Sequence, residues 1–214
     1  MAGPIIRGLL PDNTDISSGE RTLIGVCDLV ELAKEFGTPL FVYDEIHLRS
    51  RCREAVEAFD GNVAYATKAF LCTEMARLAY QEGMNLDVAT GGELFIARKA
   101  DVPGERIVMH GNNKSLEELN MALREGVGRI VVDSFNELDR LDQLCADSGV
   151  SVKIILRVTP GVEAHTHEFV STGQEDSKLG FTCLLYTSHA ADHMQSEDLG
   201  RRRINKKKNG GGGG

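Results

Sequence analysis

The sequence predicts an α/β fold in which parallel strands alternate with crossover helices. Three observations predict it: short apolar runs recur along the chain, amphipathic stretches lie between them, and the spacing of the runs is even. The runs are NVAYAT (62–67), MNLDVA (84–89), RIVMH (106–110), RIVVD (129–133) and VKIILRVT (152–159). They are rich in Val and Ile, and several lack strict alternation, as expected for strands that are covered on both faces.

The period of the runs favours a (β/α) barrel over a doubly wound open sheet. The runs start 22, 22, 23 and 23 residues apart, so each unit repeats the same geometry. A closed barrel needs eight units and about 250 residues, whereas five strands can be counted before Thr182. Two interpretations stay open: either the sheet is open, or the chain holds five of the eight strands of a TIM barrel.

The stretches between the runs carry helix patterns. Residues 44–59 place four apolar side chains on one stripe: Leu48, Cys52, Val56 and Phe59. Ser115–Glu118 has the pattern of a capping box, and Gly126 is placed to end that helix. A last helix, stopped by Gly149, carries a further apolar stripe: Leu138, Leu141, Leu144 and Cys145. Upstream, residues 27–36 predict a helix and GTPLFVYD (37–44) predicts one more strand.

Composition narrows the classes of function. The chain is 42% hydrophobic and 26% charged, which is typical of a globular domain. Its net charge is −8, and residues 1–182 alone carry 18 Lys and Arg against 29 Asp and Glu. This acidic balance argues against nucleic acid and anionic membranes as partners. No apolar run approaches the roughly 18 residues of a membrane span, and the first residues lack a signal-peptide core.

The cysteines predict a reducing compartment. The sequence has five, which are scattered, odd in number and never at CxxC spacing: Cys27, Cys52, Cys72, Cys145 and Cys183. We therefore expect free thiols in a cytoplasm rather than a disulfide framework or a zinc site. His165 and His167 resemble metal ligands at i, i+2, but no third ligand is evident, so we predict no metal site.

Candidate catalytic residues lie at the carboxyl ends of the predicted strands, where barrel enzymes gather their catalytic groups. These ends carry Lys68, Asp87, His110, Asp133 and Arg157. Neighbouring strands can desolvate Lys68, which favours the free amine that a Schiff base needs. The alternative is a solvated lysine at a strand end. Arg157 lies in a run that should be buried, where a guanidinium needs an anionic partner.

Two further features have both a functional and a structural interpretation. Gly91 and Gly92 permit a tight turn whose amides could face an anion, or they form a compact turn only. Glu93 falls in the first helical turn, where the helix dipole favours a carboxylate in any case. His110 could stack on or hydrogen-bond to a ligand, or it could be a satisfied histidine at a strand end.

Six motifs carry a resemblance to a known family: GTPLFVYDE (37–45), VAYATKA (63–69), DVATGGEL (87–94), IVMHGNNKS (107–115), IVVDSFNEL (130–138) and LRVTPGVEAHTHEFVSTGQEDSKLGF (156–181). With these in order, residues 37–181 resemble the fold-type III decarboxylases that depend on pyridoxal 5'-phosphate (PLP), and within them the diaminopimelate decarboxylases. Departures are small, with Thr90 where Ser is usual and Leu179 where Phe is usual.

The resemblance implies an alanine-racemase-like (β/α)8 TIM barrel, of which this chain holds about five of eight strands. It implies that Lys68 carries PLP as a Schiff base and that Asp87 and Glu93 match acidic positions near the cofactor. Arg157 matches a barrel-strand arginine near the pyridine ring, and His110 matches a strand-end histidine. The implied reaction converts meso-2,6-diaminopimelate to L-lysine and CO2, in a cytoplasmic homodimer.

Other functions stay open beside this one. The chain could belong to another basic-amino-acid decarboxylase of the same fold, acting on ornithine or arginine, or to a non-catalytic PLP-binding barrel protein. An open-sheet nucleotide-binding module is a further alternative, but its GxGxxG fingerprint follows none of the predicted strands.

The chain divides into three segments. Residues 1–36 are expected to be a lead-in that contributes to a β-domain in the family, and residues 37–182 a truncated PLP-binding barrel. The resemblance implies several parts that this sequence lacks: the C-terminal β-domain, the phosphate loop, the glutamate that partners the pyridine nitrogen, and residues supplied by a dimer partner. We therefore expect this 214-residue chain to be inactive.

Residues 183–214 break the pattern of the body, since basic residues cluster there and the chain ends in five glycines. The hexapeptide CLLYTS (183–188) can be back-translated as TGT CTC TTA TAC ACA TCT, the mosaic end of a transposon-based sequencing adapter. We therefore expect this segment to be non-native adapter read-through. The alternative is a genuine flexible basic tail that binds nucleic acid or directs localisation.

Overall fold

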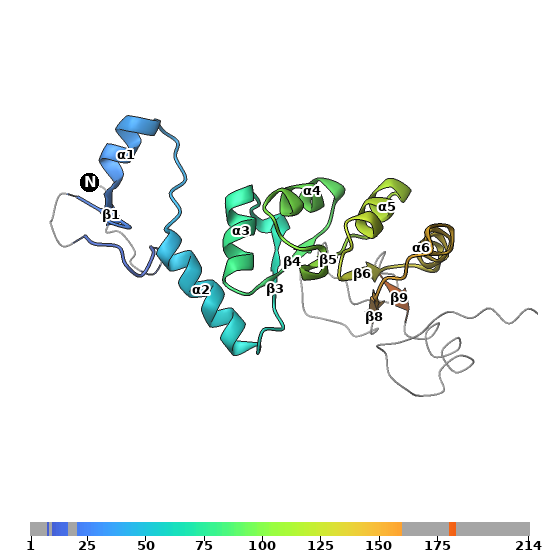
Figure 1. The fold of residues 1–214 in the computed structure, drawn as a ribbon. Helices are drawn as coiled ribbons and strands as arrows, with labels where there is room; N and C mark the ends of the chain where they lie inside the picture. The colour runs from blue at the N-terminus through green and yellow to red at the C-terminus, as the bar shows by residue number, and fades with distance from the viewer. Residues whose placement is uncertain (1–7, 9, 17–20, 160–179, 183–214) are drawn as a thin grey trace, which may run out of the picture.

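The computed structural model describes residues 8, 10–16, 21–159 and 180–182 (Figure 1). The predictions made for His165, His167 and residues 183–214 lie outside the described residues. No helix among the described residues is long and apolar enough to cross a membrane.

A five-stranded parallel sheet forms the centre of the structure. Its strands are β3 (Ala64–Ala66), β4 (Asn85–Val88), β5 (Ile107–Met109), β6 (Arg129–Val132) and β7 (Ile154–Leu156). They pair in the order in which they occur in the chain. A doubly wound sheet reverses its strand order at a switch point, and this sheet does not. The sheet is therefore part of a (β/α) barrel, as the even period predicted.

Helix α2 precedes β3, and α3 to α6 follow β3 to β6 and cover one face of the sheet (Figure 1). They are α2 (Glu45–Ala58), α3 (Thr73–Gln81), α4 (Gly91–Lys99), α5 (Leu116–Arg124) and α6 (Phe135–Ser148). Two 3-10 turns, η2 (Thr67–Ala69) and η3 (Gly104–Arg106), complete the units. One-sided cover is expected, because right-handed crossovers between strands in sequential order place every helix on the same face.

The N-terminal part forms a small separate arrangement. Strands β1 (Leu23–Ile24) and β2 (Cys27–Asp28) pair antiparallel, and α1 (Leu29–Phe36) follows with Asp28 as its N-cap. Residues 37–44, which the sequence predicted as a strand, contain no strand, so that prediction was wrong. The segment has strand-forming residues, but no described strand pairs with it, and Phe41 is largely exposed.

The predicted helices are present, with two corrections. The helix expected over 27–36 begins at Leu29, because residues 27–28 pair as β2, and Phe59 lies beyond the end of α2 and is exposed rather than on its buried stripe. Helix α2 begins after its N-cap, Asp44. Ser115 and Glu118 form the expected capping box at the start of α5. Gly149 adopts the left-handed conformation with φ +66° and ends α6. Helix α5 differs slightly, since it ends at Arg124 with Glu125 as its cap, one residue before Gly126.

The apolar run 152–159 contributes strands to two different sheets. Strand β7 belongs to the five-stranded sheet, whereas β8 (Val158–Thr159) pairs in parallel with β9 (Phe181–Thr182). Between them, the backbone N–H of Arg157 donates to the Val132 carbonyl at 3.0 Å, and its own carbonyl accepts from Phe181 N–H at 2.8 Å. Arg157 is thus held at the junction by its backbone.

The core lies between the sheet and α3 to α6. Six strand side chains are fully buried against these helices: Leu86, Val88, Ile107, Met109, Ile130 and Val132. They alternate along β4, β5 and β6, so they share the face that the helices cover. We call this the outer face of the sheet, and the opposite one the inner face.

Candidate functional site

The predicted site residues gather on the inner face at the carboxyl end of the sheet. Register pairs Asp87 with Val108, and Val131 with Ile155. Paired residues of a parallel sheet project to the same side, and so do residues two apart on one strand. His110, Asp133 and Arg157 each lie two residues beyond one of these positions. The alternation therefore places four predicted residues on one face: Asp87, His110, Asp133 and Arg157.

Asp87 and His110 lie together on the first part of this surface. The His110 Nδ1 atom is 3.5 Å from Asp87 Oδ2, and both side chains are partly exposed. The second oxygen of the carboxylate, Oδ1, is buried and has no hydrogen-bond partner among the described residues. A carboxylate beside an imidazole fixes the orientation of the ring, and Asp87 keeps one acceptor atom for a further donor.

Asp133 and Arg157 form the second pair. Asp133 is 5% exposed, and its Oδ2 lies 3.5 Å from Arg157 Nη1. The sequence predicted that Arg157 would need an anionic partner, and Asp133 is that partner. The guanidinium is less buried than expected, because 31% of the Arg157 side chain is exposed.

Lys68 lies in η2, directly after β3, and its environment differs from the prediction. The residue is exposed, so the described residues do not desolvate its amine as the sequence suggested. The turn itself is fixed, because the buried Thr67 hydroxyl donates to the Asp87 carbonyl at 2.9 Å. Lys68 is therefore an accessible amine at the end of a strand whose neighbour carries Asp87.

The helix N-terminus at Gly91 does not face an external anion. Its N–H donates to Glu118 Oε1 at 2.8 Å, so a carboxylate from α5 caps α4. Hydrogen bonds from the backbone N–H groups of Ser115 and Gly91 lower the pKa of Glu118. Glu93 also accepts a backbone hydrogen bond, from Ala89 N–H at 2.5 Å. In this structure Glu93 thus holds the turn after β4, and the Gly91 amide, which could have faced an external anion, is bound by Glu118 instead.

Sequence reasoning missed a buried ion pair behind the site. Lys114 Nζ lies 2.6 Å from Glu137 Oε1, and both side chains are almost fully buried. The same ammonium donates to the carbonyls of Val131 at 2.7 Å and Gly111 at 2.5 Å. Glu137 Oε2 accepts from Asp133 N–H at 3.0 Å. The Ser-x-x-Glu spacing at 134–137 could have indicated a capping glutamate, but nothing in the sequence paired it with Lys114.

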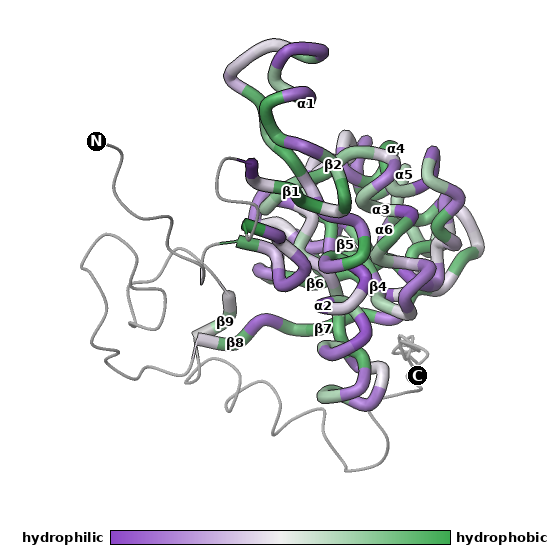
Figure 2. Tube along the Cα trace, turned by 90° about the vertical axis from the view of Figure 1, so that its left-hand side faces the viewer, coloured by the Kyte–Doolittle hydropathy of each residue, from purple (hydrophilic) through white to green (hydrophobic). Residues whose placement is uncertain are grey.

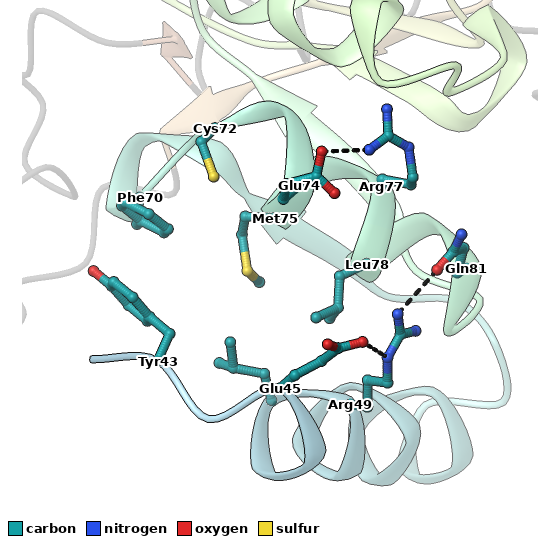
Figure 3. A pocket seen from close by; sticks show the side chains of 11 residues that line it. Tyr43, Glu45, Arg49, Phe70, Cys72, Glu74, Met75, Arg77, Leu78 and Gln81 are labelled. Atoms are coloured by element: carbon teal, nitrogen blue, oxygen red, sulfur yellow. Dashed lines mark hydrogen bonds and ion pairs between the residues drawn. The ribbon is translucent and has the colours of Figure 1, made fainter. Parts of the chain in front are cut away.

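A separate hollow of about 340 Å³ lies between the start of α2 and α3 (Figure 3). Tyr43 stacks on Phe70 at one end, with ring centroids 4.6 Å apart, and Arg49 lies at the other. None of the predicted site residues lines it. The described residues also contain no group of three or more His, Cys, Asp and Glu side chains that could hold a metal ion.

Comparisons with known proteins identify relatives of this chain. Residues 45–200 match the family model described as pyridoxal-dependent decarboxylase, pyridoxal binding domain. Diaminopimelate decarboxylase of Mycobacterium tuberculosis is 52% identical over 183 residues, which are 85% of this chain and 41% of that protein. The enzyme of Bacillus subtilis with the same name is 52% identical over 74% of this chain and 37% of its own length.

A solved structure has a similar fold. Diaminopimelate decarboxylase from M. jannaschii, in co-complex with L-lysine, superposes with a TM-score of 0.73 at 32% identity. The match covers 85% of this chain and 44% of that one. The chain therefore spans less than half the length of the curated relatives and of the solved structure that it matches.

Proposed function

Since this chain belongs to the pyridoxal-dependent decarboxylase family, we propose that it is part of an enzyme that converts meso-2,6-diaminopimelate to L-lysine and CO2 with PLP. By the complete enzyme we mean a full-length protein, of the length of these relatives, that contains this segment. One observation carries the proposal. The accessible Lys68 ends a strand of a sequentially ordered parallel sheet, and the neighbouring carboxyl ends present Asp87, His110 and Arg157 on one face.

The chemistry of these residues fits PLP. An aldehyde needs an amine that it can reach, and Lys68 is exposed. An ammonium group needs an acceptor, and Asp87 Oδ1 is a buried acceptor without a partner among the described residues. The helix N-terminus at Gly91 is capped by Glu118. We therefore propose that the phosphate group does not bind at the N-terminus of α4.

Each residue has a distinct proposed role. Lys68 binds the cofactor through its ε-amine and is the residue that exchanges with the substrate amine. When bound, PLP supplies an electron-poor ring that accepts the electron pair left when CO2 departs. Asp87 holds His110 in a fixed orientation at the inner face. Arg157 would bind the cofactor with the N–H donors that Asp133 does not approach, and Glu93 fixes the turn that follows Asp87.

The family relationship also supports proposals about assembly and location. We expect the complete enzyme to be a homodimer in which each subunit adds residues to its partner's site. We expect it to act in the cytoplasm, without nucleic acid or membrane partners. Free thiols at Cys27, Cys52, Cys72 and Cys145, together with the acidic net charge, are consistent with these expectations.

A substrate assay on the complete enzyme tests the proposal. PLP-loaded enzyme is supplied separately with meso-diaminopimelate, ornithine, arginine and lysine, and released CO2 is measured. We expect release from meso-diaminopimelate at a kcat/KM at least about 100-fold above the others, and loss of release in Lys68→Ala. Preference for ornithine or arginine would make the chain part of a different decarboxylase of this fold. Bound PLP without CO2 release from any of them would support a non-catalytic carrier.

A further inference from the structure

Four charged side chains form a cluster across the carboxyl ends of β5, β6 and β7. Lys114, Asp133 and Glu137 are buried, and Arg157 is partly exposed. We propose that Asp133 is a positioning residue that aims the Arg157 guanidinium at the inner face. This inference rests on the proposed function in one respect, since it takes Arg157 to be a cofactor-binding residue. It assigns roles to Asp133, Lys114 and Glu137, three residues that the proposed function leaves without one.

The environment of the Asp133 carboxylate points to this role. Both oxygens are buried, and neither has a hydrogen-bond partner among the described residues. A buried carboxylate without hydrogen bonds is costly unless a cation compensates its charge. Arg157 supplies that cation, with Nη1 at 3.5 Å from Oδ2. The neighbouring Lys114 is already engaged, because its ammonium contacts Glu137 Oε1 at 2.6 Å.

The Lys114–Glu137 pair explains why Asp133 has a fixed place. Glu137 uses its two oxygens for different partners: Oε1 contacts Lys114 Nζ, and Oε2 accepts from Asp133 N–H at 3.0 Å. Lys114 also donates to the carbonyl of Val131, two residues before Asp133. Hydrogen bonds therefore hold the backbone at the Val131 carbonyl and at the Asp133 N–H, and these fix the position from which the Asp133 side chain extends. A loop from β5 and a helix after β6 together fix this one carboxylate.

The geometry at Arg157 leaves room for a ligand. Its backbone is fixed by hydrogen bonds to Val132 and Phe181, so the side chain is the adjustable part. Asp133 approaches one terminal nitrogen, whereas a guanidinium has five N–H donors in a planar fork. With 31% of the side chain exposed on the inner face, the remaining donors can reach a bound group.

A double-mutant cycle on the complete enzyme tests the inference, with the dissociation constant of PLP as the readout. Asp133→Asn keeps the shape but removes the charge, and we expect PLP affinity to fall about tenfold, because the Arg157 guanidinium loses the ion-pair partner that orients it. Arg157→Met should lower PLP affinity at least as much. The double variant should bind PLP no more weakly than Arg157→Met alone. The control is Asp139→Asn, an exposed position on α6, which should leave affinity unchanged.

Additive losses in the cycle, or an Asp133→Asn variant that behaves like the control, would overturn the inference. If Asp133→Asn does not fold, the apoenzyme melting temperature of Arg157→Met replaces it. That temperature should fall, because Asp133 is left buried and unpaired, and an unchanged value contradicts the inference. Lys68→Ala separates the two proposals. If Lys68→Ala still holds PLP covalently, the proposed function fails. If Lys68→Ala loses covalent PLP but Asp133→Asn binds PLP with unchanged affinity, only this inference fails.

Discussion

The two faces of the central sheet are made by the same strands but have opposite characters. On the outer face, alternate residues of β4, β5 and β6 are fully buried under α3 to α6. On the inner face, the residues between them lead to a row of charged and polar groups at the carboxyl end, of which Asp87, His110 and Arg157 remain partly exposed. The outer face of β4, β5 and β6 is thus covered within the described residues, whereas the inner face carries the candidate site residues and is open.

The edge strands extend this contrast. Ile154, Ile155 and Leu156 of β7 are all exposed, and Figure 2 colours this strand as hydrophobic. Within the described residues, β7 pairs only with β6, and β3 pairs only with β4. An apolar strand with an unpaired edge is a template for intermolecular pairing. The helix-covered face therefore gives the segment a core, whereas the open edges leave backbone hydrogen-bonding groups of β3 and β7 unpaired within the described residues.

The largest predicted effect concerns the 214-residue chain by itself. Because the inner face and both sheet edges are open, we expect it to aggregate or to remain molten, and to release no CO2 from meso-diaminopimelate. Size-exclusion chromatography, thermal melting and the CO2 assay, run beside the complete enzyme, test this. A cooperative melt together with a PLP absorbance band in the isolated chain would contradict it.

A second prediction concerns the buried Lys114–Glu137 ion pair at the carboxyl end of the sheet. Lys114→Met leaves the Glu137 carboxylate buried without its cation and should lower the free energy of unfolding of the complete enzyme by about 3–5 kcal/mol. Chemical denaturation measures it. The double variant Lys114→Met/Glu137→Gln removes both charges and keeps a side-chain acceptor for the Asp133 N–H, so it should recover much of the loss. A double variant as unstable as the single one would refute the assignment of a buried ion pair.

A third prediction concerns the packing of α5 on the outer face, which two leucines of that helix can test. Leu119 is 0% exposed and Leu116 is 50% exposed, although both lie on the same helix. Leu119→Ala should destabilise the complete enzyme by about 2–5 kcal/mol, through lost burial and a residual cavity. Leu116→Ala is the matched control and should cost less than about 1 kcal/mol. Urea unfolding compares the two, and equal losses would mean that α5 does not pack as described.

The smallest predicted effect is the pH dependence of the Glu118 cap. The pKa of Glu118 is lowered from 4.5 by hydrogen bonds from Ser115 and Gly91 N–H. The cap therefore stabilises fully above the unfolded-state pKa, and this contribution is lost as pH falls below 4.5 through the folded-state pKa. Glu118→Gln should cost about 1 kcal/mol at pH 7 and weaken the acid dependence. Glu117→Gln, exposed in the same turn, is the control, and an identical pH profile for both would exclude the cap.

Much of the outer face could be predicted from the sequence, because it depends on local periodicity. The five apolar runs gave the strands, and Ser115–Glu118 gave its helix start, since both signals lie within a few residues. The strand expected over 37–44 failed for the opposite reason: a strand needs a partner, and propensity does not supply one.

The clustering of the candidate residues on one face was predictable, whereas their contacts were less so. Strand ends identified Asp87, His110, Asp133 and Arg157, because parallel strands bring their carboxyl ends to one edge. The Lys114–Glu137 pair joins residues 23 positions apart across two units, and no spacing rule marks such a pair. The exposure of Lys68 was also missed, because desolvation of a side chain depends on distant parts of the protein rather than on its neighbours in sequence.

The central claim is that the ε-amine of Lys68 binds PLP. The most direct measurement is borohydride reduction of the PLP-loaded complete enzyme, followed by proteolysis and mass spectrometry of the peptides. The claim predicts one reduced pyridoxyl group, on the peptide that contains VAYATKA, and none in Lys68→Ala. A pyridoxyl group on a peptide containing Lys99 or Lys114 instead, with Lys68 unmodified, would contradict it.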